Sequence, residues 1–343
     1  MSLTIPITEP FFQGVLSVER DGDIVRPWRL PHTRRHLFPS PEDSLMQKAA
    51  CASGVRLRFE TDATVLTLQF EPLPEPGENQ PNGHPFDAVV DNDIVQTVFR
   101  GEGAREARFD AIGKGTRTIE IWLPPGCPMG LSTLSAECAT NLRPMPDRRP
   151  LWVTWGSSLT HCVRAGSAAR VWPATVARQH NLNLINMGFG GNCHLEPMVA
   201  MTIRDLPARY ISLKLGINAL GNSVSARTYP ALVLAAVAII REKHSHTPLA
   251  LVSPMASPPR ESTPSATGYT LQGMRTDMEA VYHALVAAGD TNLYYVNGLD
   301  FFGEDDILRY APDDLLHPDA DGIDLQANRF SRLVMPLLLG RTD

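Results

Sequence analysis

The sequence of 343 residues predicts two domains of different fold class. Residues 1–145 are expected to form an all-β, jelly-roll-like sandwich, and residues 150–343 an α/β domain with a parallel five-stranded sheet. Three observations predict this division: apolar and polar residues alternate in the first part, strands and helices alternate in the second, and a polar stretch with two prolines, Asn141 to Arg149, separates them.

In the first part, period-two alternation predicts strands at 55–60, 66–70, 94–98 and 118–123. Turn-rich stretches, such as Pro72 to Pro85, lie between them. No segment there has a convincing helical period, so we expect no helix before residue 145. Many short strands separated by turn residues are typical of a β-sandwich.

In the second part, short apolar runs alternate with helical patterns. This order favours a parallel, doubly wound sheet, in which ligands bind at the carboxyl ends of the strands. The expected strands are 151–154, 182–187, 210–215, 249–253 and 292–297, and the expected helices are 168–180, 196–205, 226–244, 272–288 and 322–338.

Composition excludes several classes of partner. A net charge of −6 gives no basic field for nucleic acid or anionic lipid, so neither is expected as a partner. The longest apolar run, Ala231 to Ile240, is about half of what a bilayer requires. The N-terminus lacks the pattern of a signal peptide, and the five cysteines form no disulfide-like framework. We therefore expect a cytoplasmic protein, and the sequence does not indicate its oligomeric state.

Two motifs carry the candidate chemistry. Gly156 to Thr160 follows an apolar strand, which is where a nucleophilic serine can be exposed at a sheet edge. Asp314 to Pro318 places a carboxylate three residues before a histidine. Together they predict Ser158 as nucleophile, His317 as its base and Asp314 as the carboxylate that orients the imidazole. The expected reaction is acyl transfer through an acyl-serine, which requires no metal ion or cofactor.

Four blocks stand in order along the second part: Gly-Ser-Ser-Leu-Thr, Asn-Met-Gly-Phe-Gly-Gly-Asn, Gly-Ile-Asn and Asp-Leu-Leu-His-Pro. This series resembles the SGNH/GDSL hydrolase superfamily, over roughly residues 150–340. The resemblance implies a three-layer α/β/α fold. It also implies an oxyanion hole formed by the backbone N–H groups of Ser158 and Gly191 and the side chain of Asn218. No Gly-x-Ser-x-Gly elbow surrounds Ser158, which disfavours the α/β-hydrolases.

Two positions depart from the pattern of the superfamily. Ser157 stands where Asp is usual in the first block, and Ala219 where Asp is common in the third. Neither position is the triad carboxylate, so catalysis is expected to survive. The polarity near the nucleophile differs from that of typical members, which weakens inference of the substrate from them.

A β-sandwich ahead of this domain is similar to a two-domain subset that includes carbohydrate esterases and a salicylyl acyltransferase of tetracycline biosynthesis. The resemblance implies a small-molecule ester or an acyl thioester as substrate. If water accepts the acyl group, the protein is an esterase acting on a sugar or other small ester. If a sugar or natural-product hydroxyl accepts it, the protein is an O-acyltransferase.

Other interpretations stay open at this point. Ser158 and Asn218 could be ordinary turn or capping residues, and Asp314 could cap the following helix. The pairs His161-Cys162 and Cys193-His194 suggest zinc, but their spacing matches no standard site. Cys162 is a rival nucleophile without a block of its own. A carbohydrate-binding protein with a vestigial catalytic domain is the non-enzymatic alternative.

Overall fold

The computed structural model describes residues 2–340, except for the side chain of Asn222. The chain forms two compact units that are interleaved along the sequence. Unit 1 contains residues 1–35, 46–149 and 162–186, and unit 2 contains residues 36–45, 150–161 and 187–343. These units are defined by contacts between residues and do not test which parts of the chain fold independently. The domains predicted from the sequence, 1–145 and 150–343, therefore stay a prediction.

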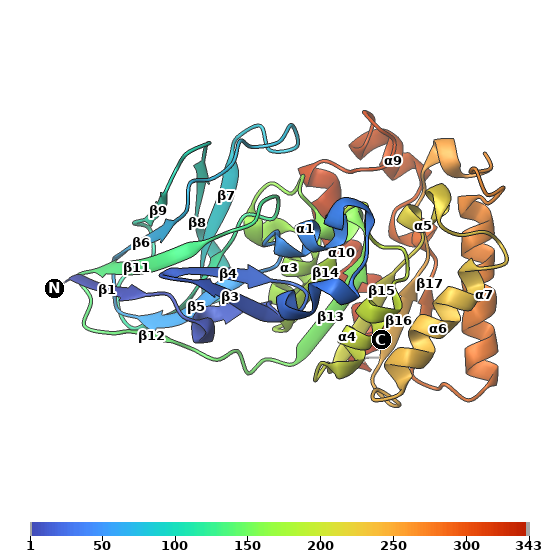
Figure 1. Ribbon diagram of the computed structural model, residues 1–343, viewed down its shortest axis with the longest axis horizontal. Helices are drawn as coiled ribbons and strands as arrows, with labels where there is room; N and C mark the ends of the chain where they lie inside the picture. The colour runs from blue at the N-terminus through green and yellow to red at the C-terminus, as the bar shows by residue number, and fades with distance from the viewer. Residues whose placement is uncertain (1, 341–343) are drawn as a thin grey trace. The chain divides into compact units, whose positions relative to one another are not determined.

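Within the described residues, unit 1 contains two antiparallel β-sheets, as the sequence predicts (Figure 1). One has the order β3-β4-β11-β6-β9, with β1 paired to β11, and the other β12-β5-β10-β7-β8, with β2 paired to β5. The strands are β1 Ser2–Pro6, β2 Phe12–Gln13, β3 Ser17–Asp21, β4 Ile24–Trp28, β5 Arg56–Thr61, β6 Val65–Phe70, β7 His84–Val90, β8 Asp93–Arg100, β9 Glu106–Phe109, β10 Arg117–Trp122, β11 Leu131–Glu137 and β12 Leu142–Pro144.

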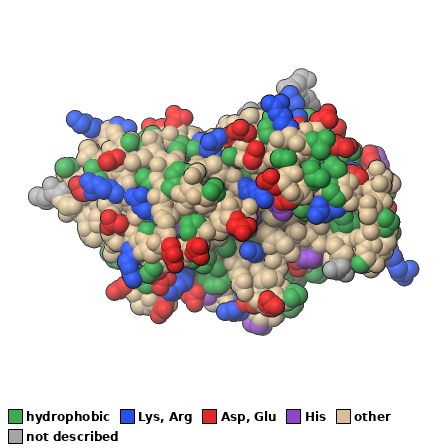
Figure 2. All heavy atoms as spheres, turned by 90° about the horizontal axis from the view of Figure 1, so that it is seen from above, with side chains coloured by type: hydrophobic (Ala, Val, Ile, Leu, Met, Phe, Trp, Pro, Cys, Tyr) green, Lys and Arg blue, Asp and Glu red, His purple; other side chains and the backbone are tan. Residues whose placement is uncertain are grey.

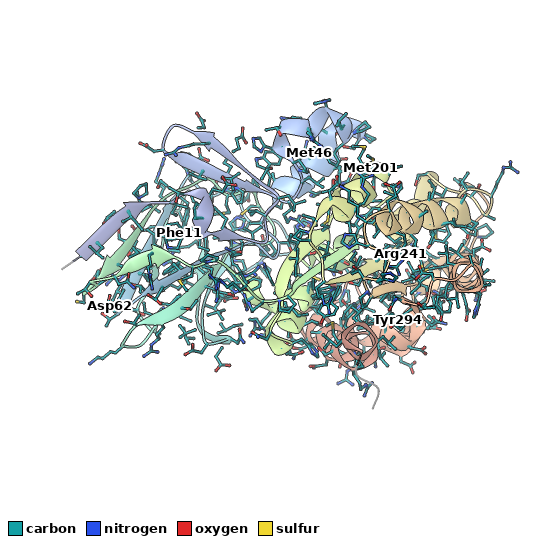
Figure 3. The ribbon with its side chains drawn as sticks, turned by 90° about the horizontal axis from the view of Figure 1, so that it is seen from below. Phe11, Met46, Asp62, Met201, Arg241 and Tyr294 are labelled. Carbon is teal, nitrogen blue, oxygen red and sulfur yellow. The ribbon has the colours of Figure 1, made fainter. Side chains whose placement is uncertain are left out.

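Alternation explains how these strands enclose a core. In β6, Leu66, Leu68 and Phe70 are buried, whereas the residues between them are partly exposed. The side chains of successive strand residues point to opposite faces, so one face of β6 packs inward. Leu57 and Phe59 of β5 and Phe11 belong to the same buried cluster, and Phe11 is labelled in Figure 3.

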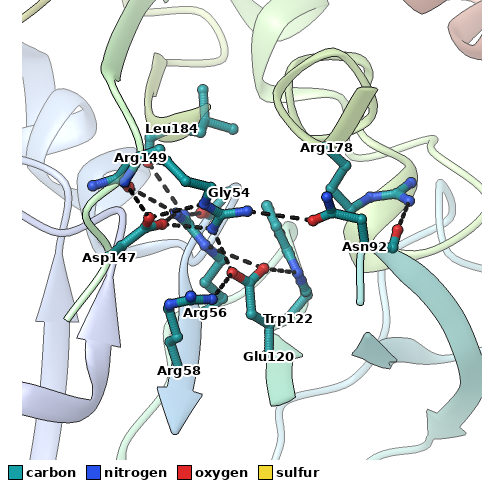
Figure 4. A network of polar contacts seen from close by, with 11 residues as sticks. Gly54, Arg56, Arg58, Asn92, Glu120, Trp122, Asp147, Arg149, Arg178 and Leu184 are labelled. Atoms are coloured by element: carbon teal, nitrogen blue, oxygen red, sulfur yellow. Dashed lines mark hydrogen bonds and ion pairs between the residues drawn. The ribbon is translucent and has the colours of Figure 1, made fainter. Parts of the chain in front are cut away.

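A buried ion network holds the segment 162–186 within unit 1 (Figure 4). The Arg56 guanidinium donates to Asp147 Oδ2 at 2.8 Å, to Asn183 Oδ1 at 2.7 Å and to the Leu184 carbonyl at 3.3 Å. Glu120 lies 3.5 Å from Arg56 Nε. Because each buried charge has an opposite charge or several polar partners beside it, the desolvation of these groups is offset.

Arg29 also binds this segment. It is completely buried and donates to the carbonyls of Lys48, Cys51 and Asn186 at 2.5, 2.7 and 2.9 Å. Burial lowers the pKa of Arg29 to about 10, so the guanidinium stays charged at neutral pH. Removing it would leave several buried carbonyl groups without a strong donor.

The second part of the described chain contains a parallel sheet with the order β14-β13-β15-β16-β17, and β14 begins in the segment that belongs to unit 1. The strands are β13 Leu151–Gly156, β14 Asn183–Gly188, β15 Tyr210–Lys214, β16 Leu249–Val252 and β17 Leu293–Val296. All four residues of β16 are buried, as expected for a central strand covered on both faces. These strands agree with the five that the sequence predicts.

Helices complete the three-layer α/β/α arrangement (Figure 1). One group packs α4 against α6 and α6 against α7, and another packs α10 against α8, α9 and α11. The α-helices of the described residues are α1 Ser44–Ala50, α2 Ser158–His161, α3 Trp172–Gln179, α4 Pro197–Asp205, α5 Ile217–Asn222, α6 Tyr229–Arg241, α7 Leu271–Ala287, α8 Gly298–Phe301, α9 Glu304–Tyr310, α10 Ala320–Leu333 and α11 Met335–Leu339.

Side chains fix where these helices begin and end. The hydroxyl of Thr270 accepts from Gly273 N at the start of α7, and Asp319 accepts from Gly322 N at the start of α10. At the end of α6, Arg241 binds both carboxylate oxygens of Asp290, at 2.7 and 3.0 Å (Figure 3). This bidentate pair fixes the chain just before β17.

Two expectations about residues 1–149 are wrong. α1 is a helix, although none was expected there, because its seven residues make about two turns and are too few for a helical period to be visible. Leu142–Pro144 were expected in a linker but form β12, which pairs with β5. Their backbone joins an edge of the sheet, where proline is tolerated.

In the described part of the chain, no helix is long and apolar enough to cross a bilayer. Figure 2 shows that acidic and basic side chains are interspersed over one face of the molecule.

Candidate active site

A tight turn after β13 presents Ser158. A Cβ added to Gly156 would lie 2.2 Å from Thr160 Oγ1 and 3.2 Å from the Lys214 carbonyl oxygen, so there is little room for a side chain where the chain passes from β13 into α2. The Ser157 hydroxyl accepts from Leu159 N at 3.3 Å, and its carbonyl accepts from His161 N at 3.0 Å. Ser158 is therefore the first residue of α2 and is half-buried.

A second turn, between α9 and α10, presents His317. Asp314 Oδ1 accepts from the backbone N–H groups of Leu316 and His317 at 3.0 and 2.8 Å, which closes the turn upon the carboxylate. Leu315 has a φ of +52°, a strained value for a non-glycine residue. Its carbonyl accepts from the Ser257 hydroxyl at 2.9 Å, which holds the turn in place.

The two turns meet through a continuous chain of hydrogen bonds. Ser158 Oγ lies 2.7 Å from His317 Nε2, and His317 Nδ1 lies 2.7 Å from Asp314 Oδ2. When the carboxylate accepts the proton on Nδ1, the imidazole presents an unprotonated Nε2 to the serine hydroxyl. The structure thus brings Ser158 and His317, 159 positions apart in the sequence, within hydrogen-bond distance of each other.

Asp314 is poised to carry a negative charge. Partial burial opposes its ionisation, but hydrogen bonds from the backbone and the imidazole of His317 outweigh burial, so the pKa of Asp314 is lowered. Asp314 and His317 retain 35% and 32% side-chain exposure, so both side chains are partly accessible to solvent.

The turn after β14 contains Gly191, which has a φ of +72°. A Cβ added to the adjacent Gly190 would lie 3.6 Å from Ser158 Cβ, so this turn lies beside the candidate nucleophile. Asn218, in the first turn of α5, accepts from Cys193 N through its Oδ1 at 3.2 Å. That bond leaves the amide nitrogen of Asn218 to donate elsewhere. The structure thus brings Gly191 and Asn218 into the same loop cluster.

Three further residues position the site: His161, which the sequence suggested as a zinc ligand, and Asn192 and Ser257, for which the sequence predicts no role. His161 accepts from Gly190 N at 3.4 Å, Asn192 donates to Gly190 O at 2.9 Å, and Ser257 supports the His317 turn. The only signal in the sequence is the placement of Asn192 after two glycines, where an asparagine side chain commonly bonds to a nearby backbone group.

The two departures from the superfamily pattern are buried. Ser157 is 2% exposed and caps α2, and Ala219 is fully buried. A cavity of about 10 Å³ adjoins Ser157, and its lining includes Lys214 and Leu316. That volume holds about one water molecule and is too small for an acyl group.

The residues that suggested zinc have other partners. His194 contacts the Gly191 carbonyl through Nε2 at 3.0 Å and the Ser223 hydroxyl through Nδ1 at 2.7 Å. Burial raises the pKa of the Cys193 thiol well above its usual value. Within residues 2–340, no three His, Cys, Asp or Glu side chains gather as a metal site.

Comparison with known families gives matches for both parts of the chain. Residues 149–335 match the GDSL-like Lipase/Acylhydrolase family, and residues 11–127 match the SsfX3 N-terminal domain family. A search of curated protein sequences gave no match.

Solved structures resemble the chain over most or all of its length. Salicylyl-acyltransferase SsfX3 from a tetracycline biosynthetic pathway is 30% identical, with a TM-score of 0.89 and coverage of 100% of this chain and 99% of that one. A GDSL-like lipase candidate from Bacteroides ovatus is 18% identical, with a TM-score of 0.81 and coverage of 99% and 98%. A family two carbohydrate esterase from Clostridium thermocellum is 16% identical, with a TM-score of 0.62 and coverage of 85% and 95%. The family match covers more than half of the sequence, and the chain therefore belongs to the GDSL-like lipase/acylhydrolase family.

Proposed function

We propose that this protein is a serine-dependent ester hydrolase in which Ser158, His317 and Asp314 form a catalytic triad. The observation that carries the proposal is the chain of two 2.7 Å hydrogen bonds joining the three side chains. Serine hydroxyls are weak nucleophiles unless a base stands within hydrogen-bond reach, and His317 Nε2 meets that requirement.

In the first half-reaction, Ser158 Oγ attacks the carbonyl carbon of an ester while its proton passes to His317 Nε2. The resulting imidazolium is stabilised by the Asp314 carboxylate. Collapse of the tetrahedral intermediate breaks the bond to the alcohol, which leaves with the proton from Nε2. The acyl group then remains on Ser158 as an ester.

In the second half-reaction, water replaces the alcohol. His317 takes a proton from the water as it attacks the acyl-serine, and returns it to Ser158 Oγ as the carboxylic acid departs. No metal ion or cofactor takes part in either half of the proposed cycle.

The negative charge that develops on the substrate oxygen requires donors. We assign them to the backbone N–H groups of Ser158 and Gly191 and the side-chain amide of Asn218. Two contacts support this: Gly190 lies beside Ser158, and Asn218 Oδ1 is already bound to Cys193 N. Loss of one such donor typically lowers kcat by about two to three orders of magnitude.

Transfer to an alcohol is the second candidate. The likeness to salicylyl-acyltransferase SsfX3 supports it, because 30% identity extends over both units of the chain. The first half-reaction would then use an acyl thioester, and a sugar or natural-product hydroxyl would replace water in the second. Exclusion of water from the acyl-enzyme would decide between the two acceptors.

We place the enzyme in the cytoplasm. The five cysteines support this assignment, because they stand at scattered positions without a Cys-x-x-Cys pair and four of them are buried. Reduced thiols are typical of that compartment.

Substitution Ser158→Ala tests the nucleophile. We expect turnover of p-nitrophenyl acetate to fall by about 10³-fold or more, with the fold retained by circular dichroism. Ser225→Ala, at a partly exposed loop serine whose backbone N–H donates to Thr228 Oγ1, is the control and should keep wild-type turnover. Equal turnover of Ser158→Ala and the wild type would rule out this mechanism. If neither form hydrolyses the ester above the uncatalysed rate, the non-catalytic carbohydrate-binding protein is favoured.

Partition of the acyl group tests the acceptor. The enzyme would be given an acyl thioester together with candidate alcohols, and the products separated by mass spectrometry. A product dominated by free acid supports the hydrolase. A product dominated by the new ester supports the transferase and replaces the first candidate.

A further inference from the structure

The peptide group between Gly190 and Gly191 is the one whose N–H would face the substrate oxygen in the proposed mechanism. Its carbonyl, Gly190 O, accepts a hydrogen bond from Asn192 Nδ2 at 2.9 Å. The carbonyl and the N–H of one trans peptide lie in one plane and point in opposite directions. A bond that fixes Gly190 O therefore also fixes the direction of Gly191 N–H.

Asn192 is itself held by a residue from the first part of the sequence. Ser44 Oγ donates to Asn192 Oδ1 at 2.7 Å. A carbonyl oxygen can only accept, so the amide nitrogen of Asn192 must face Gly190 O, and its oxygen is left for the Ser44 hydroxyl. Asn192 is 7% exposed, so water has little access to compete for these two bonds.

Ser44 reaches this position through a short segment, residues 36–45, that belongs to unit 2 although residues 1–35 and 46–149 belong to unit 1. Phe38 and Leu45 of the segment are buried. The Ser40 hydroxyl accepts from Leu45 N at 3.0 Å, which closes the turn that ends in Ser44.

We infer that Ser44 and Asn192 are positioning residues of the oxyanion hole. The bonds Ser44–Asn192 and Asn192–Gly190 O hold the peptide so that Gly191 N–H is preorganised toward the developing oxyanion. Donation to Gly190 O also polarises the peptide and makes its N–H a stronger donor. This inference rests on the proposed function, since it assigns a role within the same site.

A transition-state role predicts a loss in kcat with little change in KM. We expect Ser44→Ala to lower kcat for p-nitrophenyl acetate by about 3- to 10-fold, and Asn192→Ala by about 10- to 100-fold, below the loss of an oxyanion donor outright. Asn192→Asp should lower kcat at least as much, because a carboxylate oxygen would face the Gly190 carbonyl oxygen and could not donate a hydrogen bond to it. Ser44→Thr, which keeps the hydroxyl, should return kcat to within about twofold of wild type.

Two further measurements separate positioning from general loss of structure. Phenylboronic acid forms a tetrahedral adduct with a nucleophilic serine, so its Ki should rise in parallel with the fall in kcat/KM. The midpoint of the pH–rate profile should stay at the wild-type value, because Asp314 and His317 are untouched. Thr270→Ala is the control: it removes the side-chain cap of α7, to which no role in the site is assigned, so it should lower Tm and keep kcat within about twofold.

Wild-type kcat in both Ser44→Ala and Asn192→Asp would overturn the inference. An equal fall in kcat for Thr270→Ala, or a rise in KM without a fall in kcat for the Ser44 and Asn192 variants, would overturn it as well. Ser158→Ala separates this failure from failure of the proposed function. Retained turnover in Ser158→Ala removes the proposed function itself, whereas a requirement for Ser158 with unaffected Ser44 and Asn192 variants removes only the positioning role.

Discussion

Asp314 shows how one side chain can have two tasks. One carboxylate oxygen accepts two backbone N–H groups and shapes the turn, and the other accepts the imidazole of His317. To orient the imidazole, residue 314 must accept a hydrogen bond from His317 Nδ1. To close the turn, it needs only one oxygen that accepts hydrogen bonds from the backbone N–H groups. An amide at this position would therefore keep the turn and disturb the histidine.

Asp314→Asn should lower kcat by about 10³- to 10⁴-fold, because an amide nitrogen facing His317 Nδ1 favours the tautomer that carries a proton on Nε2. Steady-state kinetics with p-nitrophenyl acetate would measure this loss, and Tm should change little. Asp313→Asn, at the exposed neighbouring carboxylate, is the matched control with wild-type kcat. Activity of Asp314→Asn within tenfold of wild type would contradict the role.

At this scale the sequence predicts the residues that occur in motifs. Ser158, Asp314 and His317 could be named because nucleophile, carboxylate and base follow a recognisable order. Asn192 and Ser44 could not be paired, because a hydrogen bond between single polar residues 148 positions apart has no local pattern.

Helix α2 and strand β14 meet with no room between their backbones. A Cβ added to Gly188 would lie 2.3 Å from His161 N and 2.5 Å from Thr160 C. Both neighbours are backbone atoms, which cannot move by a change of rotamer. The helix that begins at Ser158 thus depends on the absence of a side chain on the adjacent strand.

Gly188→Ala should therefore displace α2 and lower the free energy of unfolding by about 1–3 kcal/mol, as overpacking generally does. Because Ser158 begins that helix, kcat should fall as well. Thermal unfolding and ester turnover would measure both effects. For comparison, a Cβ added to Gly101 meets nothing within 4 Å, and Gly101→Ala should change neither quantity. An unchanged Tm for Gly188→Ala would argue against this tight contact.

Helices and strands could be predicted from the sequence where their hydrophobic pattern extends over enough residues. The five parallel strands and the helices that became α4, α6 and α7 agree closely with the sequence, because buried strands and long amphipathic helices repeat their signal. Short elements such as α1 and β12 were missed. Their formation depends on contacts with distant parts of the chain, which periodicity does not encode.

Across unit 1, buried charge joins distant parts of the sequence. Asp147 has no exposed side-chain surface and bonds to Arg56 and Arg149. Burial opposes its ionisation, but hydrogen bonding to Arg149 and the charge of Arg56 outweigh it and lower the pKa of Asp147 to about 2. The folded state therefore binds this proton less readily than the unfolded chain does.

A pKa lowered in the folded state stabilises the protein above the unfolded pKa, near 3.8, and the contribution is lost as pH falls toward about 2. Asp147→Asn should therefore destabilise the protein by about 2 kcal/mol at pH 7, with a smaller difference from wild type at pH 3. Urea titrations at the two pH values would measure it. Asp23→Asn, at an exposed residue, should show no difference at either pH. If the difference in free energy of unfolding between Asp147→Asn and the wild type were the same at pH 7 and pH 3, the lowered pKa of Asp147 would be contradicted.

The interleaving of the units limits how such genes can be recombined. A chimaera joined at the polar stretch near residue 145 would take residues 36–45 from one parent and the loop that contains Asn192 from the other. If the protein were split near residue 145, residues 162–186 would remain on the C-terminal fragment, although they belong to unit 1. Functional exchange between relatives therefore requires that these crossing segments travel together with the unit they complete.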